Sequence, residues 1–355
     1  MTAPRSFSSL PGPLTHALEW CLNGSNAAVA TVTGTWGSAP RPAGSFMAIS
    51  SDGRVEGSVS GGCVEADVIQ AASSLMQSGT GTTRLNYGIS NGMAWETGLA
   101  CGGKLEVLVE AVKTPSCPHG TLPFSILGRI LTMQERRQRG ILIRSYDGSE
   151  HILSNATLQT CPDILRETAA QILLDEKAQT TERHFLQPIT PPPRLLIVGA
   201  VHIAQILAPM ARLTGFETII IDPRSSLATP ERFPGETLMT EWPDEAMEHC
   251  GLDDSTAVVT LTHDLRFDDP ALIAALKSPA FYVGALGSRT TQGSRLLRLQ
   301  ESGITPENLQ RLRGPVGLAI GGIGAEEIAL SIMADLVAVR RHAPLAEKPG
   351  WTTPS

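Results

Sequence analysis

Long apolar runs are missing from this sequence. No segment approaches the length of a transmembrane helix, and the first twenty residues hold no unbroken apolar stretch of the signal-peptide type. We therefore expect a cytoplasmic protein without a membrane partner. An excess of positive charge is missing too, because the formal net charge is −7. This argues against a nucleic-acid partner held through phosphate contacts. The two basic clusters, ERRQRG (135–140) and VRRH (339–342), are expected to be solvated surface.

Cysteine is scarce and scattered. The chain has 6 cysteines, without a C-x-x-C pair, at Cys21, Cys63, Cys101, Cys117, Cys161 and Cys250. A disulfide framework and a structural zinc site both require closer sets of cysteines, so neither is expected here. At least some of these residues should be free thiols.

The length of 355 residues suits two domains, and a proline-rich stretch marks the boundary between them. Residues 188–193, PITPPP, predict a stiff extended linker. We therefore expect an N-terminal α+β domain over residues 1–187, a Rossmann-like domain over 194–342, and a tail over 343–355.

The C-terminal half alternates strand and helix patterns. Apolar runs predict strands at 194–198, 217–222, 257–262, 280–286 and 315–320, and helical spacing predicts helices at 203–213 and 325–341. Alternating helices and all-apolar strands predict a doubly wound parallel sheet, which is an α/β fold.

The N-terminal half has a different pattern. It predicts a helix at 16–22, strand and turn material from residue 27 to the first cysteine loop, a helix at 65–76, a strand at 104–112, and a hairpin at 141–153 around Asp147 and Gly148. This half should be α+β, and the order of its strands cannot be predicted from the pattern.

A glycine turn opens the Rossmann-like domain. Gly199 follows the first strand, and Asp222 closes the second strand 23 positions later, where a carboxylate can accept a hydrogen bond from a ribose hydroxyl. The G-x-G-x-x-G fingerprint is incomplete, because Val201 stands at its second glycine and Ala204 at its third. Val201 obstructs the approach of a pyrophosphate, so a Rossmann-like fold with weak or no NAD binding is the simpler interpretation.

Polar residues follow two later strands of this half. His263 and Asp264 come after one strand, and Ser288 and Arg289 come after another. Ligands of such sheets bind outside the carboxyl ends of the strands, and a serine, an arginine and backbone donors suit a phosphate. The alternative is that these residues only cap helices and cover the surface.

Two cysteines lie in glycine-rich frames. Cys63 follows Gly61 and Gly62 just before an expected helix start, where the helix dipole favours a thiolate. Cys101 precedes Gly102 and Gly103. A thiolate is a soft metal ligand and a nucleophile, whereas burial as a small apolar residue is the ordinary role of a free cysteine. The residues alone leave both interpretations open.

Several stretches, in order from about residue 28 to 340, resemble the XdhC/CoxI family of accessory proteins for molybdenum hydroxylases such as xanthine dehydrogenase and carbon monoxide dehydrogenase. They include GSVSGGCVEADV, GLACGGKLEVLVE, VVTLTHD, YVGALGSRTT and GPVGLAIGGIGAEEIALSIMADLVA. Two positions depart from the family pattern: Val201 replaces a glycine and Ala319 replaces an aspartate.

The resemblance implies a cofactor chaperone rather than an enzyme. Such a protein binds the molybdenum cofactor (molybdopterin, with or without a cytidine nucleotide), protects it while its sulfido ligand is installed, and inserts it into an apo-molybdenum hydroxylase. A cysteine desulfurase would be the sulfur donor, and a homodimer is compatible with this role. Cys63 and Cys101 would contact the molybdenum or its dithiolene. The other cofactor-binding candidates are Gly61, Gly62, Gly102, Gly103, Gly199, His202, Asp222, His263, Ser288 and Arg289.

Two other functions stay open. One is an NAD(P)-dependent oxidoreductase, for which Asp222 would hold the ribose and Arg224 would suit a 2′-phosphate. The other is a thiol-based redox sensor that uses Cys63 and Cys101.

Overall fold

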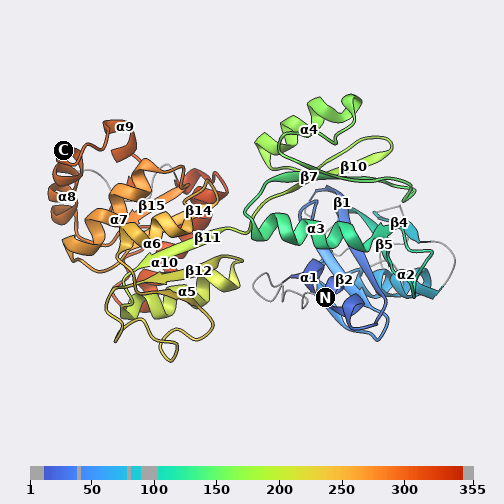
Figure 1. Ribbon diagram of the computed structural model, residues 1–355, viewed down its shortest axis with the longest axis horizontal. Coiled ribbons are helices and arrows are strands. Elements are labelled where there is room, and N and C mark those ends of the chain that lie inside the picture. The colour runs from blue at the N-terminus through green and yellow to red at the C-terminus, as the bar shows by residue number, and fades with distance from the viewer. Residues whose placement is uncertain (1–11, 38–40, 78–80, 89–102, 347–355) are drawn as a thin grey trace. The chain divides into compact units, whose positions relative to one another are not determined.

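The computed structural model describes residues 12–37, 41–77, 81–88 and 103–346 (Figure 1). Its contacts divide the chain into two compact units, Met1–Pro191 and Pro192–Ser355. In the described ranges no helix is both long enough and apolar enough to span a bilayer. Cys101 and Gly102 lie outside the described residues.

The first sheet of the N-terminal unit has the order β3-β2-β1-β5-β4 and is antiparallel throughout this path. Its strands are β1 (Ala27–Trp36), β2 (Phe46–Ser50), β3 (Val55–Gly57), β4 (Thr82–Tyr87) and β5 (Lys104–Lys113), and the short β6 (Leu122–Pro123) pairs with β5 in parallel.

Alternate residues of β1 serve the two faces of this sheet, as the period of a strand requires. Ala28, Ala30 and Val32 join the core under α2 (Glu65–Gln77). Ala27 and Val29 join a second core with α1 (Pro13–Leu22) and α3 (Phe124–Glu135). Both cores are apolar. α2 covers one face of the sheet, and α1 and α3 cover the other.

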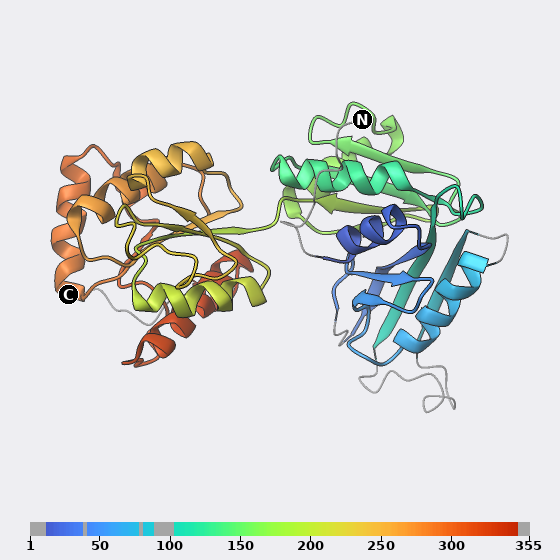
Figure 2. The same ribbon diagram turned by 60° about the horizontal axis from the view of Figure 1, so that its bottom comes forward.

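The second sheet has the order β8-β7-β10-β9. It contains β7 (Gly140–Ser145), β8 (His151–Asn155), β9 (Gln179–Thr180) and β10 (His184–Ile189), and α4 (Asp163–Asp175) packs on it. The core that includes α1 and α3 takes residues from both sheets. Figure 2 shows α1 (blue) and α3 (green) next to each other. The expected hairpin at 141–153 is present as β7 and β8.

The proline-rich linker is shorter than its sequence predicts. Pro188 and Ile189 belong to β10 and pair with Ile141 and Gly140 of β7. β9 pairs only with the first half of β10, so Pro188 lies where β10 has an open edge and its missing N–H is tolerated.

A buried polar network joins the two sheets of this unit. Arg144 of β7 donates to Glu110 of β5 (Nη1–Oε2, 2.9 Å), to Thr31 of β1 (2.9 Å) and to Gln187 of β10 (2.9 Å). The Nε2 of His151 lies 2.6 Å from the other oxygen of Glu110. Burial raises the pKa of Glu110, but His151 and Arg144 outweigh it and the net pKa is lowered. Arg144 and Glu110 therefore form a charged pair, and their opposite charges balance each other within the core.

The second unit is a parallel sheet of order β13-β12-β11-β14-β15-β16, which confirms the expected doubly wound fold. Its strands are β11 (Arg194–Val198), β12 (Glu217–Ile221), β13 (Thr237–Met239), β14 (Thr256–Thr260), β15 (Tyr282–Ala285) and β16 (Leu312–Arg313). Its helices are α5 (His202–Leu213), α6 (Pro243–Cys250), α7 (Leu265–Lys277), α8 (Arg289–Glu301), α9 (Pro306–Leu309) and α10 (Ala325–Arg340), followed by a 3-10 turn, η1 (Pro344–Ala346).

The helices cover both faces of this sheet (Figure 1). α5 and α10 pack on one face, and α6, α7 and α8 pack on the other. The strand order reverses between β11 and β14, so the loops after these two strands are where a ligand of such a fold would bind.

The predicted strand at 315–320 is wrong. The last strand is β16 (Leu312–Arg313), and the chain then turns toward α10. Gly317 has a φ of +90°, and a Cβ there would lie 2.5 Å from the Oγ of Ser331. This close approach to the helix requires the glycine, and it is incompatible with an extended strand. Val316 is buried, and this explains the apolar pattern.

Candidate functional site

The loop between β3 and α2 is folded around the carboxylate of Glu65, the first residue of α2. The Oε1 of Glu65 accepts hydrogen bonds from the hydroxyl of Ser58 (2.6 Å) and from the N–H groups of Ser60 (2.9 Å) and Gly61 (3.0 Å). Its Oε2 accepts from the Ser60 hydroxyl and from the N–H of Gly62 (2.9 Å). The carboxylate thus occupies the anion position that a helix start and a glycine loop create together.

These hydrogen bonds keep Glu65 ionised. Partial burial raises the pKa of Glu65, but the donors from Ser58, Ser60 and the backbone outweigh burial and lower the pKa from 4.5 to about 2. The N–H groups of Gly61 and Gly62 therefore point to a charge of the chain itself. That Gly61 and Gly62 contact a cofactor stays a prediction.

Cys63 lies on the outer side of this ordered loop. Its N–H donates to the Ser60 hydroxyl (2.9 Å), and its side chain is exposed. Gly62 has a φ of +120°, and a Cβ there would meet nothing within 4 Å, so the space beside Cys63 is open. The loop holds the backbone of Cys63 in place while its thiol faces outward.

The other described cysteines lie in less accessible surroundings. Burial raises the pKa of Cys21 to about 11 and raises the pKa values of Cys117 and Cys161. Cys21 and Cys250 are half-buried, and Cys117 and Cys161 are buried. Cys63 is therefore the exposed thiol among the cysteines that the structure describes.

Of the second cysteine frame, Cys101 to Gly103, the structure describes Gly103. Gly103 is buried and directly precedes β5, whose Leu105 pairs with Tyr87 of β4. Tyr87 packs in the same core as Val64 and Val68, beside the start of α2. Burial raises the pKa of Tyr87 to about 12, and the charges of Asp67 and Glu65 add to the rise. Gly103 therefore lies at the same end of the sheet as the Cys63 loop. That Cys101 reaches Cys63 stays a prediction.

In the Rossmann unit, the glycine turn is also closed by a carboxylate of the chain. Asp222 is fully buried, and its Oδ2 accepts from the N–H of Ala200 (2.8 Å). The guanidinium of Arg224 donates to both oxygens of Asp222 (Nε–Oδ1 2.9 Å, Nη2–Oδ2 2.7 Å). Burial raises the pKa of Asp222, but Arg224 and the backbone donors lower it overall. Its oxygens are bound to the protein rather than presented to a ribose.

The other residues of this turn lead into α5 and are fixed by packing within the unit. Gly199 has a φ of +109°, and a Cβ there would lie 2.5 Å from the Cγ2 of Thr262. Val201 is the residue before α5 and packs against the core, and His202 is the exposed first residue of α5. The turn is therefore shaped by contacts within the unit.

The residues after β14 and β15 cap helices. Asp264 accepts from the N–H of Arg266 (3.0 Å) at the start of α7, and Ser288 and Thr291 exchange hydrogen bonds at the start of α8. His263 and Arg289 are exposed. Helix capping, the alternative to ligand binding, thus explains Asp264 and Ser288. His263 and Arg289 lie at the surface, and their role as cofactor-binding residues stays a prediction.

Sequence reasoning missed Glu65, which organises the loop. The signal available was an acidic residue in the first turn of a helix that follows a glycine loop, and this pattern is common at helix starts. No sequence pattern shows that the side chain of Glu65 folds back to accept hydrogen bonds from the loop that precedes it.

Comparison with known proteins agrees with this architecture. Residues 20–88 match the sequence model of the XdhC and CoxI family, and residues 195–336 match that of the XdhC Rossmann domain. The chain is 30% identical over 330 residues to a protein of Escherichia coli (strain K12) named molybdenum cofactor insertion chaperone PaoD, covering 93% of this chain and 88% of that protein. The chain belongs to the XdhC and CoxI family.

Two further proteins match most of the chain. A Bacillus subtilis (strain 168) protein, named as a probable subunit of xanthine dehydrogenase, is 31% identical over 329 residues, covering 89% of this chain and 94% of that protein. A crystal structure from Bacillus halodurans, described as a xanthine dehydrogenase, has a TM-score of 0.72 at 22% identity and covers 95% of this chain and 99% of that one. At this identity the structural match shows a shared fold.

Proposed function

We propose that this protein binds the molybdenum cofactor as cargo and inserts it into an apo-molybdenum hydroxylase. The supporting observation is the exposed thiol of Cys63 on a loop that Glu65 holds in place. A sulfur ligand presented on an ordered backbone suits a soft metal–dithiolene group. The role named for the Escherichia coli relative supports the same class of cargo.

The chemistry of the loop defines how the cargo would be held. Glu65 fills the anion position, so the loop would contact the sulfur-rich head of the cofactor through Cys63, and the phosphate would bind elsewhere. Cys101 would approach from the same end of the sheet, because Gly103 lies there. The protein would shield the head while its sulfido ligand is installed.

The finer points of this function are part of the proposal. A cysteine desulfurase would supply the sulfur, the carried form would be molybdopterin or its cytidine dinucleotide, and the protein would act in the cytoplasm, either as a monomer or as a homodimer. These points rest on the family and on the chemistry of the cofactor.

The test is transfer to a client. The full chain, loaded with molybdenum cofactor, is mixed with an apo-hydroxylase, and recovered hydroxylase activity is measured. Cys63→Ser should abolish most of the recovery because it removes the sulfur and keeps the size. Cys21→Ser is the matched control, since Cys21 is a half-buried thiol in α1 of the same unit. Equal recovery with Cys63→Ser and wild type would contradict the proposal.

The geometry argues against the alternative of an NAD(P)-dependent oxidoreductase. That function needs Asp222 or Arg224 to contact the nucleotide, and in the structure these two side chains bind each other. Equilibrium dialysis with NADH and NADPH should show millimolar affinity or none. Micromolar binding of either would restore the alternative.

A further inference from the structure

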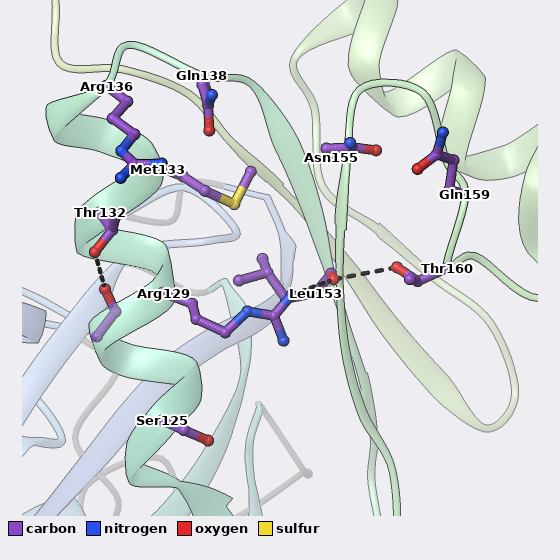
Figure 3. A pocket seen from close by; sticks show the side chains of 11 residues that line it. Ser125, Arg129, Thr132, Met133, Arg136, Gln138, Leu153, Asn155, Gln159 and Thr160 are labelled. Carbon is purple, nitrogen blue, oxygen red and sulfur yellow. Dashed lines mark hydrogen bonds between the residues drawn. The ribbon is translucent and has the colours of Figure 1, made fainter.

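The N-terminal unit has a cavity of about 510 Å³, open to solvent, that the proposed function does not use. It lies between α3 and β8, together with the segment that follows β8 (Figure 3). The residues that line it are Ser125, Gly128, Arg129, Thr132, Met133, Arg136, Gln138, Leu153, Asn155, Gln159 and Thr160.

One wall of this cavity is a polar face of α3. Ser125, Arg129, Thr132 and Arg136 recur every three or four residues, which places them on one side of the helix. The opposite side carries the buried residues Ile126, Leu127, Ile130 and Leu131. This face is exposed to solvent at Ser125, Arg129 and Arg136. Asn155, Gln159 and Thr160 lie across the open cavity from it.

The charge of the cavity has one sign. Two of its lining residues, Arg129 and Arg136, are cationic, and none of the described residues that line it is acidic. Within the described ranges neither arginine forms an ion pair with a carboxylate. Arg129 is also oriented, because its Nη2 donates to the carbonyl of Leu153 (3.2 Å), which Thr160 also contacts (3.2 Å). The remaining N–H groups of its guanidinium are suited to an anion.

Gly128 has no packing reason to be a glycine. It stands in the middle of α3, where glycine weakens a helix relative to alanine. A Cβ at Gly128 would meet nothing within 4 Å, so no neighbour excludes a side chain there. The effect of the glycine is to leave the wall of the cavity open.

We propose that this cavity binds a small molecule that carries a phosphate group, with Arg129 and Arg136 as its charge partners and Gly128 leaving room for it. Its volume lies within the range of small-ligand sites. The proposal gives the ERRQRG cluster a role that its sequence does not suggest, since Arg136 and Gln138 line the cavity. It does not depend on the binding of the molybdenum cofactor.

Isothermal titration calorimetry on the full chain tests this. The probes are inorganic pyrophosphate, cytidine 5′-monophosphate and uncharged cytidine, at two salt concentrations. Pyrophosphate and the nucleotide should bind, more weakly at high salt, and cytidine should not. Tighter binding of the nucleotide than of pyrophosphate would identify a nucleotide ligand. Equal binding would identify recognition of phosphate alone.

Substitutions locate the site. Arg129→Ala and Arg136→Ala should each weaken binding at least tenfold. Arg341→Ala, which removes an exposed arginine from the other basic cluster, should leave binding unchanged. Gly128→Leu should abolish binding without altering charge, and thermal unfolding would show that this variant folds. The proposal is overturned if wild type binds neither pyrophosphate nor the nucleotide. It is also overturned if Arg129→Ala, Arg136→Ala and Gly128→Leu bind these probes as tightly as wild type and Arg341→Ala do.

Discussion

The turns before α2 and α5, one in each unit, both lead through glycine into a helix, and a carboxylate of the chain occupies both. Glu65 closes the loop before α2, and Asp222 closes the turn before α5. Both carboxylates accept backbone N–H groups, and both have lowered pKa values. A glycine-rich helix start is therefore not by itself an open anion site in this protein.

The two turns differ in what they leave exposed. Glu65 is bound entirely by donors of its own loop, and the neighbouring thiol of Cys63 stays outside. Asp222 is fully buried under Arg224, and both of its oxygens are used. The first turn leaves a thiol exposed, whereas both carboxylate oxygens of the second turn are bound within the protein, and this difference supports our proposal that the N-terminal unit holds the cofactor.

The largest effect should follow from Glu65→Gln. The neutral amide loses the charge-assisted hydrogen bonds that order the loop, so retention of the molybdenum cofactor should fall at least tenfold, although Cys63 is unchanged. Molybdenum content after gel filtration measures this. Asp67→Asn is the matched control, because Asp67 is an exposed acid in the same turn of α2 and should retain the cofactor.

Asp222→Asn should affect stability rather than cargo. It weakens the bond to the buried N–H of Ala200 and the pair with Arg224, so the second unit should lose about 1–3 kcal/mol of unfolding free energy. Denaturant unfolding measures this loss, and cofactor retention should stay at the wild-type level. A fall in retention equal to that of Glu65→Gln would show that the two turns are not functionally different.

Gly62→Ala should have a smaller effect on the first turn. The φ of +120° is unfavourable for alanine, and this costs about 1–3 kcal/mol, but the Cβ enters open space and meets no atom. We expect a modest loss of stability and partial retention of the cofactor. Loss as complete as that of Glu65→Gln would mean that the loop tolerates no backbone change.

The order of the Cys63 loop should not depend on pH above about 5. The pKa of Glu65 in the folded protein is about 2, below its ordinary 4.5, so its stabilising effect is present above 4.5 and is lost as the pH falls through the folded value. The amide NMR signals of Gly61 and Gly62 should be constant between pH 8 and 5. A titration of these signals with a midpoint near 6 would show that Glu65 is not held as described.

The smallest effect, none at all, is expected from Val201→Gly. This change restores the second glycine of the dinucleotide fingerprint, but Arg224 still covers Asp222. The affinity for NADH should stay as weak as that of wild type in equilibrium dialysis. A large gain in affinity would identify Val201, rather than the covered carboxylate, as the obstacle.

Much of the second unit could be predicted from its sequence, because its strands are uninterrupted apolar runs between amphipathic helices. The exception was 315–320, where Val316 and Leu318 look like strand residues but lie on either side of a turn at Gly317 that packs against α10. In the N-terminal unit, local patterns predicted α2, β5 and the β7–β8 hairpin. The order of its strands depends on distant pairs such as β1 with β5, and no local pattern shows these.

The site was less predictable than the fold. Glycines and a cysteine before a helix predicted the place of the Cys63 loop, but the occupant of its anion position depends on the direction of one side chain, that of Glu65. Likewise, the spacing of Asp222 predicted a ribose contact, and in the structure Arg224, two residues later, donates to both oxygens of that carboxylate. In both cases, the partners of the carboxylate are set by short-range hydrogen bonds that form when the chain folds.

The most direct test of this account is the amount of molybdenum that the purified full chain retains after incubation with molybdenum cofactor and gel filtration. Wild type and Cys21→Ser should retain molybdenum in proportion to protein, and Cys63→Ser should retain less than a tenth of that amount. Equal retention by Cys63→Ser, or no retention by wild type, would contradict the assignment of the Cys63 loop as the site that holds the cofactor.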